Sequence, residues 1–241
     1  MKVRGIAHRG YSVKYPENTL SSYQAACDLG FEILELDAHL SKDGIPVLMH
    51  DATIDRMTDG EGWIKDYTVE ELKRFRVGEN ETIPTLEEAL RLVKGKMIVS
   101  IELKQKGYRY PGLEQAVVDV IRKVDMLDQV YIIGFDHYAV ARMRQLNNQI
   151  ELGLVLSGAS PAVFSFMKKI RANYLAVGAA YITEEYVRAC QEHGVQLIAW
   201  TVNTEQQIRE MLRYPSVLCT TDELELFKSI YETTANTVRN G

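Results

Sequence analysis

Short apolar runs alternate with amphipathic stretches along the whole chain. Most of the runs are rich in branched or aromatic residues, which is typical of buried strands. Eight runs predict strands: Val3–Ala7, Phe31–Leu36, Met97–Ile101, Val130–Ile133, Leu152–Leu156, Tyr174–Val177, Val195–Ala199 and Val217–Cys219. Between them, apolar residues recur at spacings of three and four, most clearly from Leu113 to Val124, and this spacing predicts helices with one apolar face.

Several of the amphipathic stretches also carry start and stop signals for helices. The N-cap and N3 residue types that satisfy free backbone donors occur at Thr85 with Glu88, Thr204 with Gln207, and Asp222 with Glu225. A glycine stands where a helix should stop at Gly30, Gly95 and Gly194. Glycine adopts the left-handed conformation that helix ends often need.

Strict alternation of eight strands and helices predicts an α/β protein with a parallel sheet, and eight strands close into a (β/α)8 TIM barrel. A doubly wound open sheet is the alternative. About 45 residues separate the second strand from the helix that starts at Thr85, far more than a usual βα loop. This stretch contains an extended run at Ile45–His50, a turn at Asp59–Gly62 and a short helix at Thr68–Phe75. We therefore expect one domain over residues 1–241, with a small rim insertion at about 40–80 between the second strand and second helix.

Composition narrows the class of protein. The chain of 241 residues is 46% hydrophobic and 25% charged, which suits a single soluble barrel. A net charge of −5 without a Lys/Arg cluster argues against nucleic-acid binding. No apolar run approaches the roughly 18 residues of a membrane span, and no signal peptide precedes the first strand, so we expect a cytoplasmic protein. The three cysteines lie far apart and predict neither disulfides nor a thiolate metal site.

Polar and aromatic residues follow several of the predicted strands. They are His8 and Arg9 after the first strand, Glu35 and Asp37 on the second, Glu102 and Lys104 on the third, and Trp200 to Asn203 on the seventh, with His50 and Asp51 supplied by the insertion. The carboxyl ends of barrel strands meet on one rim, where active sites form. We therefore expect these groups to lie together.

The carboxylates in this group favour a metal site. Glu35 and Asp37 are two residues apart on a strand and so point to the same side. If Glu102 comes from the neighbouring strand, the three carboxylates form an oxygen-rich set that suits one hard divalent cation, Mg²⁺ or Ca²⁺, better than zinc. Taken alone, Glu35-Leu36-Asp37 or Glu102-Leu103-Lys104 would indicate a solvated strand end that carries surface ion pairs. Their shared location favours the metal.

The histidines and cations indicate phosphoryl chemistry. A single histidine after a strand is usually structural, but His8 and His50 occupy the same setting and form a candidate general acid–base pair. Arg9 and Lys104 beside a metal would hold an anionic oxygen, and Arg binds phosphate bidentately. The chemistry that this combination predicts is transfer at phosphorus.

Taken in order, these elements resemble the glycerophosphodiester phosphodiesterase family of the phospholipase C-like barrels. The resemblance covers nearly the whole chain and is carried by Ile6-Ala7-His8-Arg9-Gly10, Pro16-Glu17-Asn18-Thr19, Glu35-Leu36-Asp37, Lys42-Asp43-Gly44, His50-Asp51, Ile83-Pro84-Thr85-Leu86, Glu102-Leu103-Lys104 and Trp200-Thr201-Val202-Asn203. Departures at Ser41, Ser100, Gly134 and the Glu that follows Asp222 remove none of the proposed ligands or catalysts.

The resemblance implies a role for each residue of the group. His8 and His50 are the expected catalytic acid and base, Glu35, Asp37 and Glu102 the metal ligands, and Arg9 and Lys104 the phosphate contacts. It also implies that Glu17 supports the site and that Trp200 faces the substrate, although rim packing is an alternative for Trp200. Asn18 has two interpretations of equal weight, a site residue or a cap for the following helix.

The expected activity is metal-dependent hydrolysis of a small glycerophosphodiester to glycerol 3-phosphate and an alcohol. The attacking nucleophile is either water or the glycerol 2-hydroxyl. Two alternatives from other classes are a phosphodiesterase or lyase acting on lysophospholipids, and a catalytically silent phosphoglycerol-binding barrel. The sequence leaves the headgroup and the oligomeric state open.

Overall fold

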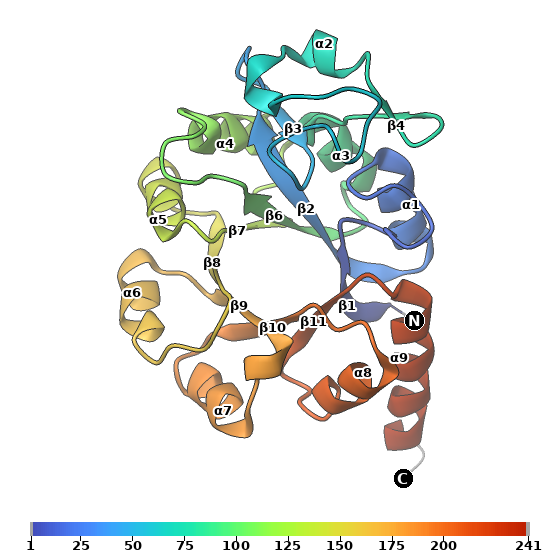
Figure 1. The fold of residues 1–241 in the computed structure, drawn as a ribbon. Coiled ribbons are helices and arrows are strands. Elements are labelled where there is room, and N and C mark those ends of the chain that lie inside the picture. Colours follow the sequence, from blue (N-terminus) through green and yellow to red (C-terminus); the bar gives the residue numbers. More distant parts are fainter. Residues whose placement is uncertain (1, 240–241) are drawn as a thin grey trace.

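Eight parallel strands close into a barrel in the computed structural model, which describes residues 2–239 and their side chains as far as Thr234 (Figure 1). The barrel strands are β1 Val3–His8, β2 Phe31–Leu40, β6 Ile98–Leu103, β7 Val130–Ile133, β8 Glu151–Leu156, β9 Tyr174–Gly178, β10 Gln196–Trp200 and β11 Leu218–Thr221. Strand β1 pairs in parallel with both β2 and β11, and this pairing closes the ring. The predicted (β/α)8 barrel is confirmed, and the open sheet is excluded.

A helix follows each barrel strand and packs against the outside of the ring (Figure 1). These helices are α1 Leu20–Asp28, α3 Leu86–Val93, α4 Leu113–Val124, α5 His137–Leu146, α6 Val163–Ile170, α7 Glu184–Glu192, α8 Glu205–Met211 and α9 Leu224–Arg239, with a short 3-10 turn η2 at Ala179–Tyr181 before α7. None of the helices within residues 2–239 is long and apolar enough to cross a membrane.

Most of the predicted helix signals act as expected. Thr85 and Thr204 form capping boxes with Glu88 and Gln207. The three glycines at helix ends have positive φ angles: Gly30 at 84°, Gly95 at 75° and Gly194 at 66°. Glycine adopts positive φ angles at little steric cost because it has no Cβ.

The predicted cap at Asp222 is wrong. Helix α9 begins only at Leu224, and the Asp222 carboxylate instead accepts a hydrogen bond from His8 across the barrel rim. Glu225, its expected capping partner, pairs with Lys14 at 2.6 Å. Barrel closure instead brings side-chain donors from His8, Ser12 and Asn203 to Asp222, and these occupy both of its carboxylate oxygens.

Alternating side chains divide the barrel strands into an outer and an inner face. On β2, Leu34 and Leu36 pack outward in the large cluster under the helices, whereas Ile33 lies in a separate cluster inside the barrel. This inner cluster comprises Ile6, Ile33, Tyr131, Ile133, Val155, Ala176, Ile198 and Leu218. Because the strand period is two, Glu35 and Asp37 follow Ile33 on the inner face, above this apolar floor.

The segment between β2 and α3 forms a small structure beside the barrel, at the top of Figure 1. It contains β3 Pro46–Leu48, η1 Ile64–Asp66, α2 Val69–Leu72, β4 Arg76–Val77 and β5 Glu81–Thr82. An apolar cluster of its own includes Val47, Met49, Ile54, Ile64, Leu72, Val77 and Ile83. Strand β2 extends to Leu40 and pairs antiparallel with β3, which directs His50 back toward the barrel.

The apolar floor predicts a strong effect of Gly153→Ala. A Cβ on Gly153 would lie 2.7 Å from Tyr174 Cβ, 2.9 Å from the Tyr174 backbone oxygen and 3.0 Å from Ile133 Cγ2. Because strand backbone cannot move aside cheaply, we expect the free energy of unfolding to fall by about 1–3 kcal/mol in denaturant titrations.

Gly158→Ala is the matched control for that substitution. A Cβ there would meet only Tyr181, at 3.8 Å, and we expect an unchanged or slightly raised free energy of unfolding. Equal effects of the two substitutions would contradict the packing argument.

Candidate active site

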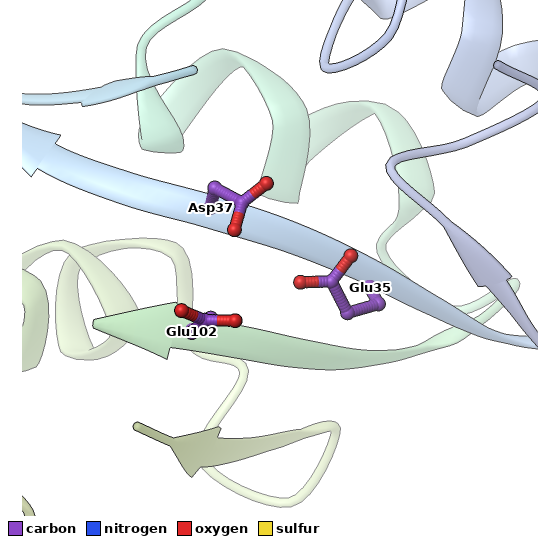
Figure 2. A group of neighbouring side chains, drawn as sticks. All are labelled: Glu35, Asp37 and Glu102. Atoms are coloured by element: carbon purple, nitrogen blue, oxygen red, sulfur yellow. The ribbon is translucent and has the colours of Figure 1, made fainter. Parts of the chain in front are cut away.

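Strand register gathers three carboxylates at the carboxyl ends of β2 and β6. Asp37 on β2 lies directly opposite Glu102 on β6, and Glu35 lies opposite His8 on β1. The side chains of Glu35, Asp37 and Glu102 turn toward one another (Figure 2), with one oxygen from each within 4.8 Å of the others. Glu35 is only 4% exposed and Asp37 only 1%. This buried carboxylate group has the geometry to hold a metal ion.

Two cationic side chains partly compensate this buried negative charge. Lys104 Nζ lies 2.8 Å from Glu102 and 3.2 Å from Asp37. The Arg9 guanidinium lies 3.3 Å from Asp37, and the Arg9 backbone amide donates a hydrogen bond to Glu35 at 3.1 Å. Three carboxylates thus face two permanent cations, which leaves one negative charge for another cation to neutralise.

The pKa values show how this excess charge is distributed. Burial, and then repulsion from Asp37, raises the pKa of Glu35 well above its usual range and also raises that of Glu102. Burial alone would raise the pKa of Asp37, but Lys104 and Arg9 lower it. In the absence of a further cation, Glu35 therefore tends to hold a proton. An added divalent cation would replace that proton, so the group fits a metal site on both geometry and charge.

Asn18 belongs to this group, and its interpretation as a helix cap is wrong. The side chain of Thr19 caps α1. Asn18 is buried with a φ of 56°, and its amide donates to Asp37 at 2.9 Å while its oxygen accepts from the Tyr23 hydroxyl. Asn18 thus fixes the orientation of the Asp37 carboxylate.

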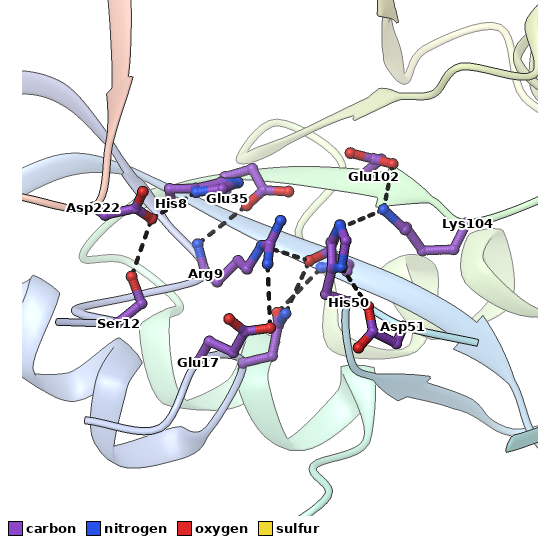
Figure 3. Close-up of polar contacts among 12 residues, drawn as sticks. His8, Arg9, Ser12, Glu17, Glu35, His50, Asp51, Glu102, Lys104 and Asp222 are labelled. Atoms are coloured by element: carbon purple, nitrogen blue, oxygen red, sulfur yellow. Dashed lines mark hydrogen bonds and ion pairs between the residues drawn. The ribbon is translucent and has the colours of Figure 1, made fainter. Parts of the chain in front are cut away.

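His8 is held by Asp222, a residue whose role the sequence did not reveal. His8 Nδ1 lies 2.7 Å from Asp222 Oδ1, and Ser12 donates to the same oxygen (Figure 3). Asn203 donates to the other oxygen of Asp222. Burial lowers the pKa of His8, but the hydrogen bond to Asp222 and the charge of Glu35 outweigh it, and the net pKa is raised. The one sequence signal for this role is the position of Asp222 directly after the last strand, next to Thr221. The helix-cap prediction already accounts for an aspartate at that position, so the signal is not specific.

His50 is held by a second carboxylate, from the insertion. Its Nδ1 lies 2.8 Å from Asp51, which in turn accepts from Arg56. Arg56 also donates to Glu17 at 2.6 Å. Glu17 in turn accepts from Arg9 at 3.2 Å (Figure 3). Burial, with Lys104 and Arg9 nearby, lowers the pKa of His50. Both histidines therefore use Nδ1 for orientation, which leaves Nε2 for other partners.

Most of these groups surround one cavity of about 180 Å³ at the barrel mouth. Its lining includes His8, Arg9, Glu35, His50, Glu102, Lys104 and Trp200, above apolar side chains of the barrel floor. Trp200 stands edge-on to Phe135, with ring centroids 5.7 Å apart. Glu17 lies behind Arg9 rather than on this lining. Two oriented imidazoles and two cations around a small cavity are suited to proton transfer on an anionic ester.

His39 lies behind the cavity. Its Nδ1 accepts from the Tyr110 hydroxyl at 2.8 Å, and its Nε2 donates to the His50 backbone oxygen at 3.2 Å. Burial lowers the pKa of His39 to about 4, so it is neutral at physiological pH. His39 therefore supports the position of His50.

Comparison with known proteins places the chain in a family. Residues 8–226 match the model of the glycerophosphoryl diester phosphodiesterase family. The chain is 34% identical to the glycerophosphodiester phosphodiesterase of Caldanaerobacter subterraneus subsp. tengcongensis, over 88% of this chain and 91% of that protein, and 36% identical to that of Bacillus altitudinis, over 86% and 89%.

A solved structure shares both the fold and the class of activity. A phosphodiesterase from Oleispira antarctica, determined in complex with the product sn-glycerol-3-phosphate, superposes with a TM-score of 0.90 at 28% identity, over 96% of this chain and 97% of that one. With a family model that spans nearly the whole chain, this protein belongs to the glycerophosphoryl diester phosphodiesterase family.

Proposed function

We propose that the protein hydrolyses small glycerophosphodiesters to glycerol 3-phosphate and an alcohol, using a divalent cation and two histidines. The observation that carries this proposal is the pair of imidazoles, each bound to its own carboxylate, beside three buried carboxylates and two cations. The product bound by the Oleispira antarctica phosphodiesterase supports glycerol 3-phosphate as the product here.

Glu35, Asp37 and Glu102 would hold the cation, which is Mg²⁺ or Ca²⁺ because all three ligands are carboxylates. When bound, the cation neutralises charge on a phosphoryl oxygen as the transition state forms. Asn18 and the Arg9 backbone amide orient two of the ligands through hydrogen bonds. Such supporting contacts tune metal sites.

Arg9 and Lys104 bind the phosphate of the substrate. Both form ion pairs with the carboxylate group, Arg9 with Asp37 and Lys104 with Asp37 and Glu102, so their charges are fixed in place before substrate arrives. Arg9 is further held by Glu17, and its backbone has a φ of 57°. This arrangement needs little reorganisation when the phosphate binds.

His8 and His50 transfer the protons. One histidine accepts the proton of the attacking hydroxyl, which belongs to water or to the glycerol 2-hydroxyl, and the other donates a proton to the departing alcohol oxygen. Asp222 and Asp51 hold the two rings so that Nε2 of each is the reacting nitrogen. Trp200 forms the wall of the cavity beside them.

Removal of either imidazole tests the proposal directly. We expect His8→Ala and His50→Ala each to lower kcat for release of glycerol 3-phosphate by about a hundredfold to ten-thousandfold, and chelation of divalent cations to abolish it. His193→Ala is the control, because His193 is exposed at the far end of α7 and stacks on Phe164. Full activity in both variants and in chelator would rule out this site, whereas metal binding without hydrolysis would indicate a binding module.

The pH profile should respond to Asp222→Asn. Loss of the carboxylate lowers the raised pKa of His8, so the limb of the kcat/KM profile that His8 controls should move to lower pH while the His50 limb stays. Movement of the alkaline limb identifies His8 as the proton donor, and movement of the acidic limb as the acceptor. Asp28→Asn, which alters an exposed carboxylate on α1, is the control. An unchanged profile in Asp222→Asn would contradict the role of the pair.

Metal binding should release a proton. Because Glu35 has a raised pKa in the metal-free protein, we expect up to about one proton per cation at neutral pH, and weaker metal binding as the pH falls. Calorimetry in buffers of different ionisation enthalpy measures this release. In Glu35→Gln the release should disappear, and equal proton release by this variant would contradict the assignment.

A further inference from the structure

A second and larger cavity adjoins the site on the side of His50. It measures about 710 Å³ and shares His50, Glu102, Lys104 and Phe135 with the barrel-mouth cavity. Its other wall is formed by the loop from β6 to α4 and by the start of α5, with Lys106, Arg109, Asp136, His137 and Tyr138. We call this cavity the side groove.

The two cavities suit different halves of a diester. The barrel-mouth cavity of about 180 Å³ is enclosed by strands and holds a small group of constant shape, such as glycerol. The side groove is about four times larger and accommodates alcohols of different sizes. If the proposed function is correct, the phosphate at Arg9 and Lys104 joins the two halves, and the alcohol extends into the side groove.

The charges on the wall of the side groove are unbalanced. Neither Lys106 nor Arg109 has an ion-pair partner within residues 2–234, and Arg109 instead rests on the Trp63 ring at 5.3 Å. The one acidic residue on this wall, Asp136, is already used. It accepts from the backbone amides of Gly107, Tyr138 and Ala139. These neutral donors leave the carboxylate charged, so the wall carries two cations against one anion, a net positive charge.

The loop that carries these cations is fixed by hydrogen bonds. Gln105 and Tyr110 exchange two of them, at 2.8 and 2.9 Å, across the base of the loop. The bond from Gly107 to Asp136 ties its tip to α5. Lys106 and Arg109 are therefore held beside the groove in a protein whose net charge is −5.

We propose that the side groove binds the alcohol half of the substrate and selects alcohols that carry a second anionic group, a carboxylate or a phosphate. Lys106 and Arg109 are the residues that determine this specificity. They act on binding and transition-state affinity by charge alone, without contact with the reacting phosphorus. This inference rests on the proposed function.

Three synthetic diesters with matched alcohols test it. The alcohols are the same short chain ending in a carboxylate, a hydroxyl or an ammonium: hydroxypropionate, propanediol and aminopropanol. We expect kcat/KM for release of glycerol 3-phosphate to fall in that order, by about threefold to tenfold at each step in low salt, and the differences to shrink at about 0.5 M salt.

Variants assign the preference to the two cations. The double variant Lys106→Gln with Arg109→Gln should reduce the carboxylate-to-hydroxyl ratio of kcat/KM to about one. Among single variants, Arg109→Lys should keep most of the ratio that Arg109→Gln loses, because lysine retains the charge. A purely structural effect of the substitutions would lower kcat/KM for all three substrates alike and leave the ratio unchanged. Lys96→Gln is the matched control, since Lys96 is an exposed cation at the other end of β6.

The outcomes separate the two proposals. Equal kcat/KM for the three diesters, or a ratio unchanged in the double variant, would overturn the side-groove inference while the proposed function stands. Release of glycerol 3-phosphate from none of the three would overturn the proposed function, and this inference with it.

Discussion

Burial of three carboxylates on the inner face of the barrel is the constraint on which the site depends. Like charges in a poorly solvated setting repel each other strongly, and the fold tolerates them because Lys104 and Arg9 lie within 3.3 Å of the group. The compensation is incomplete, and the raised pKa of Glu35 is its consequence. A site that retains negative charge and offers carboxylate oxygens favours a divalent cation over another side chain.

The same rim supplies two histidines by different routes. His8 comes from the end of β1 and is oriented by Asp222, which follows β11. His50 comes from the insertion and is oriented by Asp51, which is linked through Arg56 and Glu17 to Arg9. The insertion is therefore connected to the phosphate side of the site by a chain of ion pairs. The pKa values of the two histidines shift in opposite directions. Burial lowers both, but the hydrogen bond to Asp222 and the charge of Glu35 outweigh it for His8, whose pKa is raised, whereas that of His50 stays lowered.

Side chains inside the barrel form two layers, and this division shapes the cavities. Apolar residues and the stacked pair Tyr131 and Tyr174 close the floor, so the enclosed cavity ends above them and stays small. Space for a larger group adjoins the site to the side, between the β6–α4 loop and α5. The barrel interior thus limits one half of the substrate, and the loops determine what the other half can be.

Local patterns in the sequence determined the eight strands, most helix ends and the residues of the carboxylate group, because strand periodicity, capping and spacing act between near neighbours. The Glu35 and Asp37 pair is such a case, since two residues on one strand must face the same side. The carboxylate partner of His50 is its neighbour Asp51, but the partner of His8 is not visible from the sequence. Asp222 lies 214 residues from His8, and it was interpreted as a helix cap because its local pattern fits one. The role of Asn18, as a site residue or a helix cap, is equally ambiguous in the sequence, and its hydrogen bond to Asp37 resolves it. Closure of the barrel between β1 and β11 decides the contact of His8 with Asp222, since it brings the two ends of the chain together. The contact of Asn18 with Asp37 is decided by the packing of the β1–α1 loop against β2.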